Sequence, residues 1–151
     1  MDLNLFLSDI KDISRVNANI LLGDVAIGKT ALFKKNCSKY TYIDFNEILE
    51  DCFSKTYNSL RVFNIGSFFK YINNVIGYNT EITIIDNLEV VMNILYNLEP
   101  EGQEIIKFFN DLTLQGYLGK VVFVISNVRR IKVESLLYKS NFPHQNIKIW
   151  G

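Results

Sequence analysis

A glycine-rich segment near the amino terminus has the residue types and spacing of a phosphate-binding loop. Gly23 to Thr30 matches the pattern G-x-x-x-x-G-K-[ST] at every fixed position. Glycines let the backbone curl so that successive N–H groups point at phosphate oxygens. In this chemistry Lys29 binds the β- and γ-phosphates and the Thr30 hydroxyl binds Mg²⁺. The expected nucleotide contacts are Gly23, Asp24, Val25, Ala26, Ile27, Gly28, Lys29, Thr30 and Ala31.

A carboxylate after a second apolar segment completes the expected magnesium site. A magnesium–nucleotide site needs a carboxylate at the end of another strand, and residues 82–85 lead directly to Asp86. We therefore expect Thr30 and Asp86 to hold the metal, although an Asp here could also only cap the next helix. The following residue is Asn87, which cannot accept a proton. The nearest Glu is Glu89, which is therefore the candidate general base instead of residue 87.

Further polar and basic residues follow a third apolar segment. Residues 121–125 lead to Asn127, which could hold the γ-phosphate or the attacking water, or could be an ordinary turn residue. Arg129 and Arg130 come next. An Arg here can act on the nucleotide of a neighbouring subunit, and a solvated pair is the alternative. Arg61 is a weaker candidate for the same role. Arg15 and His144 are weaker candidates for contact with the adenine of the nucleotide.

The apolar pattern predicts the elements that position these residues. Short apolar or β-branched runs predict buried strands at 18–22, 40–45, 82–85, 121–125 and 147–150. Helical spacing predicts helices at 3–13, 28–39, 68–76, 88–98, 103–114 and 133–138, and one more after Asn46, its expected cap. Solid apolar strands that alternate with helices indicate a single α/β domain, a three-layer sandwich with a five-stranded, mainly parallel sheet.

Composition limits the function classes. The 151 residues carry 16 basic and 16 acidic side chains, which argues against a free-standing basic nucleic-acid-binding module. Contact with nucleic acid is expected only indirectly, through a partner or an oligomer. A single His leaves little material for a His-based zinc site or a Ser-His-Asp triad. The longest apolar run, 121–125, is too short to span a membrane. We expect a cytoplasmic protein.

The order of these motifs resembles the core of AAA+ ATPases over most of the chain. Leu21-Leu22-Gly23 before the loop and Tyr42-Ile43-Asp44 in the second strand are similar to that group. The small size and the segment Ile84 to Glu89 resemble the BrxF family of BREX phage-defence systems. This resemblance implies a bacterial cytosolic ATPase that works with larger defence proteins. The chain departs from the pattern at Asn87, where the group usually has Glu, and we expect no carboxyl-terminal helical lid.

Three functions remain open. The first is an ATP- and Mg²⁺-dependent switch or weak ATPase that assembles with itself or with a partner. The second is a small-molecule P-loop kinase, with Arg129 and Arg130 in a phosphate-clamping lid, although Ala26 replaces a glycine common in such kinases. The third is a pseudo-ATPase that binds ATP only for structure. The missing Asn-Lys-x-Asp signature favours ATP over GTP. Sheet order separates the first two, because additional-strand ATPases place the Asn127 strand between the loop strand and the Asp86 strand.

Overall fold

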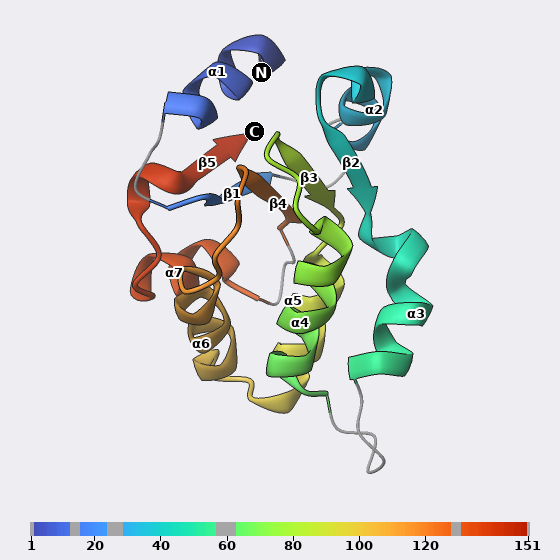
Figure 1. Ribbon diagram of the computed structural model, residues 1–151. Helices are drawn as coiled ribbons and strands as arrows, with labels where there is room; N and C mark the ends of the chain where they lie inside the picture. The colour runs from blue at the N-terminus through green and yellow to red at the C-terminus, as the bar shows by residue number, and fades with distance from the viewer. Residues whose placement is uncertain (1, 13–15, 24–28, 57–62, 128–130, 151) are drawn as a thin grey trace.

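The computed structural model describes residues 2–12, 16–23, 29–56, 63–127 and 131–150 (Figure 1). Within these ranges five strands form one sheet in the order β2-β3-β4-β1-β5. All four of its strand pairings are parallel. The strands are β1 (Ala18–Gly23), β2 (Thr41–Asp44), β3 (Thr83–Asp86), β4 (Val121–Ser126) and β5 (Ile147–Trp150). The prediction of a five-stranded, mainly parallel α/β sheet is confirmed.

Seven α-helices are described beside this sheet. They are α1 (Leu3–Asp12), α2 (Lys29–Lys35), α3 (Phe45–Thr56), α4 (Ile65–Ile76), α5 (Glu89–Leu98), α6 (Gln103–Leu112) and α7 (Val133–Lys139). Two short 3-10 turns, Cys37–Lys39 and His144–Asn146, precede β2 and β5. None of the described helices is long and apolar enough to cross a membrane.

The helix predicted at 28–39 is shorter in the structure. It ends at Lys35, and a separate 3-10 turn follows at Cys37–Lys39. The residue between them is Asn36, whose side-chain amide donates to the Leu32 carbonyl at 2.9 Å. An Asn side chain that bonds the main chain competes with the helical ladder, so α2 ends before β2 begins.

The helices lie on both faces of the sheet, which gives three layers. Neighbouring residues of a strand point to opposite faces. Leu21 and Val122 pack with α1 and α2 in one core cluster. Ile20 and Phe123 pack with α3 to α7 in a second, larger cluster. In Figure 1, α1 and α2 lie above the sheet and α4 to α7 below it. The solid apolar strands are thus buried on both sides.

The amino ends of β2 and β3 are held by side-chain hydrogen bonds and by a close main-chain approach. The Asn79 amide donates to the hydroxyls of Thr41 and Thr83, both at 3.0 Å. Gly119 lies so close to this turn that an added Cβ would overlap the main-chain carbonyl of Glu81. These contacts fix the edge at which β2 and β3 begin, and the opposite edge carries the polar residues considered next.

Candidate functional site

The carboxyl ends of β1, β3 and β4 bring together residues that the sequence places far apart. Parallel strands end at one edge of their sheet, and crevices at that edge are common ligand sites in α/β folds. Gly23 at the end of β1 pairs with Ser126 at the end of β4. The main-chain N–H of Asn127 donates to the Gly23 carbonyl at 2.8 Å. Asp86 ends β3, on the other side of β4.

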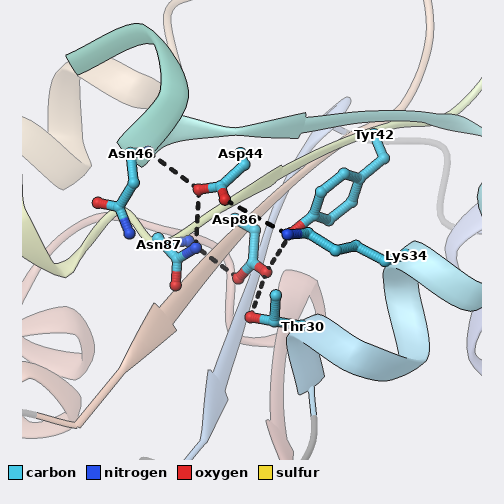
Figure 2. A network of polar contacts seen from close by, with 7 residues as sticks. All are labelled: Thr30, Lys34, Tyr42, Asp44, Asn46, Asp86 and Asn87. Atoms are coloured by element: carbon cyan, nitrogen blue, oxygen red, sulfur yellow. Dashed lines mark hydrogen bonds and ion pairs between the residues drawn. The ribbon is translucent and has the colours of Figure 1, made fainter. Parts of the chain in front are cut away.

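Asp86 is buried and accepts three hydrogen bonds at this edge (Figure 2). The Thr30 hydroxyl and the Tyr42 hydroxyl both donate to its Oδ2, each at 2.7 Å. The main-chain N–H of Asn87 donates to its Oδ1 at 2.9 Å. A buried carboxylate needs such donors to replace water. The two residues predicted to hold the metal, Thr30 and Asp86, are therefore in direct contact.

Tyr42 belongs to the site, although no site role was predicted for it from the sequence. It lies in β2 next to β3, where it pairs with Ile84. Burial, and then its bond to Asp86, raise the pKa of the phenol above its ordinary value, so the hydroxyl stays protonated and donates. The sequence places Tyr42 only within the strand predicted at 40–45. The available signal was its place two residues before Asp44, on the same side of β2.

Asp44 and Asn87 form a second layer of contacts beside Asp86. The Asp44 Oδ1 accepts from the Asn46 main-chain N–H at 3.0 Å and from the Asn87 side-chain amide at 2.8 Å. Asp44, rather than Asn46, is therefore the cap of α3, and the prediction for Asn46 was wrong. Lys34 lies 3.9 Å from the other Asp44 oxygen (Figure 2).

The backbone of Asn87 explains why this position carries an Asn. Its φ of 66° is in the left-handed region, which Asn tolerates better than most residues. Its side-chain amide is bonded to Asp44, so both its backbone and its side chain belong to the turn between β3 and α5. Asn87, which stands where the sequence resemblance leads one to expect a Glu, therefore has a structural role in this turn.

Glu89 begins α5 and reaches the end of β4. Its Oε1 accepts from the main-chain N–H of Ser126 at 2.9 Å. Burial raises the pKa of this carboxyl, the negative charge of Asp86 adds to the rise, and the bond from Ser126 opposes it. A carboxylate with a raised pKa is a better proton acceptor. Because Ser126 pairs with Gly23, Glu89 lies at the same edge as the predicted loop.

Several predicted residues lie outside the described ranges. Lys29 is described only as the first residue of α2, and Ala31 is an exposed residue of the same helix. The His144 ring packs against Tyr138 of α7, at 4.9 Å between ring centroids, outside the network of Figure 2. The residues outside the described ranges are Asp24, Val25, Ala26, Ile27, Gly28, Arg15, Arg61, Arg129 and Arg130.

The oxygen donors of Thr30 and Asp86 fit Mg²⁺. This ion prefers oxygen ligands, keeps several waters and takes only one or two protein groups. A hydroxyl 2.7 Å from a buried carboxylate is a donor set of that kind. In the part of the chain that the structure describes, no group of three or more His, Cys, Asp or Glu side chains could hold a metal.

Comparison with models of known protein families gives no match, and no curated protein is significantly similar to the chain.

Proposed function

We propose that the chain is an AAA+-like P-loop domain that binds ATP with Mg²⁺ and acts as a weak or assembly-dependent ATPase. The observation that carries this proposal is the 2.7 Å bond from the Thr30 hydroxyl to Asp86. These residues are 56 positions apart in the sequence. A magnesium site shared by the loop Thr and a strand-end carboxylate predicts that they lie close together. The α2 helix begins at Lys29, the Lys of the motif itself, as a phosphate-binding loop requires.

The sheet order supports an ATPase rather than a small-molecule kinase. β4, which leads to Asn127, lies between β1, which leads into the loop, and β3, which ends at Asp86. That is the order of additional-strand ATPases. In the kinases considered as the alternative, no strand is inserted between the loop strand and the acidic strand.

In this proposal each site residue has a separate role in ATP hydrolysis. Thr30 donates its hydrogen to Asp86, which leaves the hydroxyl lone pairs free for a metal. Bound Mg²⁺ would neutralise charge on the phosphates. Glu89 has one oxygen held by Ser126, and we assign it the proton of the attacking water. Asn127 follows β4, where a sensor of the γ-phosphate would stand.

Two lysine substitutions test nucleotide binding. Lys29→Ala should weaken binding of MgATP by about 10- to 150-fold, because a charge-assisted contact contributes roughly 1.5–3 kcal/mol. Lys35→Ala, at the exposed end of the same helix, should leave binding unchanged. The rise in Tm on addition of MgATP measures nucleotide binding in both variants. If the Lys29→Ala protein is stabilised as much as the wild type, the assignment of the loop is wrong.

Two glutamate substitutions separate an ATPase from a pseudo-ATPase. Glu89→Gln should abolish phosphate release while MgATP binding persists. Glu47→Gln provides the control, since Glu47 is also in the first turn of a helix but is exposed. Slow phosphate release that is equal in the wild type and Glu89→Gln would favour the pseudo-ATPase.

We also propose that the domain functions in an assembly, either as a homo-oligomer or with larger proteins of a bacterial defence complex in the cytoplasm. Nucleic acid would be reached only indirectly, through these partners. Arg129 or Arg130 would act on the nucleotide of a neighbour. Light scattering should show a larger assembly with MgATP, and turnover per chain should rise with protein concentration. A monomer unchanged by ATP, with turnover independent of concentration, would refute this part.

A further inference from the structure

The two oxygens of Asp86 are not equally available to a metal. Each carboxylate oxygen has about two lone-pair positions. Oδ2 accepts from both Thr30 and Tyr42, so its positions are filled. Oδ1 accepts from the Asn87 main-chain N–H and has one position left. The oxygen that faces Thr30 therefore has no lone pair to give to a metal while both hydroxyls donate.

Tyr42 is held in place by its own surroundings. Its strand, β2, pairs with β3 at Ile84, and its ring packs against the core cluster under α1 and α2. Its hydroxyl donates to Asp86 Oδ2 at 2.7 Å. Rotation of the phenol away from Asp86 would leave a partly buried hydroxyl without this bond, which is unfavourable.

The filled oxygen affects Mg²⁺ and Ca²⁺ differently. Mg²⁺ keeps several waters and accepts a hydroxyl ligand whose hydrogen is bonded to an outer carboxylate, as Thr30 and Asp86 are arranged. Ca²⁺ takes six to eight oxygen ligands, and carboxylates bind it directly through one or both oxygens. With Oδ2 filled, Asp86 cannot bind Ca²⁺ through both oxygens, and only the remaining position of Oδ1 could contact the ion.

We propose that Tyr42 is a positioning residue that sets the metal specificity of the site. By donating to Asp86 Oδ2 it keeps Asp86 as an outer partner of Thr30, which favours Mg²⁺ and disfavours Ca²⁺. The inference rests on the proposed binding of a metal–nucleotide complex at Thr30 and Asp86. It concerns the choice of metal and does not depend on hydrolysis.

The test compares two tyrosines that make similar bonds. Tyr42→Phe removes the bond to Asp86. Tyr40→Phe removes the 2.7 Å bond from the Tyr40 hydroxyl to the Phe33 carbonyl, on the same face of the sheet and away from Asp86. Calorimetry measures the affinity for ADP with Mg²⁺, with Ca²⁺ and with a chelator. Tyr42→Leu, which also lacks the hydroxyl but fills less space, repeats the measurement.

The expected result is a change in metal preference alone. Tyr42→Phe and Tyr42→Leu should raise the ratio of Ca²⁺-ADP to Mg²⁺-ADP affinity by roughly tenfold, the effect of one hydrogen bond to a charged group. Affinity for ADP with the chelator should not change, and Tyr40→Phe should keep the wild-type ratio. A ratio that is unmoved in both Tyr42 variants, or that moves equally in Tyr40→Phe, overturns the inference. A wild type that binds ADP with neither metal instead refutes the proposed function.

Discussion

Asn87→Glu introduces the residue that AAA+ ATPases, which the order of motifs resembles, usually have at this position, and the structure predicts that the change impairs the protein. The φ of 66° at Asn87 suits Asn but is unfavourable for Glu. The substitution also removes the donor that bonds Asp44 at 2.8 Å and brings a negative charge toward that carboxylate. Asn87→Glu should therefore destabilise the domain and should not speed hydrolysis.

The size of the effect can be estimated from these two losses. A left-handed backbone costs an ordinary residue about 1–2 kcal/mol. A hydrogen bond to a charged acceptor contributes roughly 1.5–3 kcal/mol, and we take the lower end because Asn87 and Asp44 are only partly buried. The sum is about 3 kcal/mol. In a domain of this size 1 kcal/mol changes Tm by about 2–4 °C, so Tm should fall by about 6–12 °C.

Two further variants divide the loss into its parts. Asn87→Gly removes the bond but tolerates the positive φ, so about half of the fall in Tm should remain. Asn87→Ala removes the bond and keeps the strain, and should lie below Asn87→Gly by about 1 kcal/mol. Thermal melts and phosphate release are measured on the same samples. An Asn87→Glu protein that melts with the wild type and releases phosphate tenfold faster would show that Asn87, and not Glu89, occupies the catalytic position.

Three other predictions concern different parts of the molecule. Gly119→Ala should lower stability by about 1–3 kcal/mol in a thermal melt because its Cβ would overlap Glu81, whereas Gly116→Ala, which meets no atom within 4 Å, should be nearly neutral. Burial raises the folded-state pKa of Glu89, so ionisation of this carboxyl opposes folding by an amount that grows between the ordinary and the raised pKa and is complete above the raised one. Glu89→Gln should therefore raise Tm at neutral pH, and the gain should shrink as pH falls through the raised pKa. Trp150, the one Trp of the sequence, lies on β5 and pairs with Gly23 of β1, the first residue of the predicted loop. Its fluorescence should therefore change on addition of MgADP.

Much of the fold could be predicted because it follows from short-range patterns. The apolar runs at 18–22 and 121–125 became β1 and β4, each one residue longer than predicted. Solid apolar strands indicate burial on both faces, and helices do cover both faces. The helix predicted at 28–39 was too long at its carboxyl end, because Asn36 bonds the Leu32 carbonyl through its side chain and α2 ends at Lys35.

The site was only partly predictable, for a different reason. Asp86 could be found because a carboxylate directly follows an apolar strand. Tyr42 could not, because its role depends on the register of β2 against β3 and on the reach of a phenol. The role of Asn87 depends on a backbone angle and on an amide bond to Asp44, neither of which a single sequence displays. Such properties arise only when distant segments pack together.

The charge of this edge bears on the form in which nucleotide would bind. Asp44, Asp86 and Glu89 each accept a main-chain N–H, from Asn46, Asn87 and Ser126 respectively. Among the described residues Lys34, 3.9 Å from Asp44, is the basic side chain that forms an ion pair at this edge. Main-chain donors stabilise these three carboxylates but do not cancel their charge, so the carboxylates attract a divalent cation. We therefore expect the proposed site to take nucleotide with its metal, and Tyr42 to influence which metal arrives.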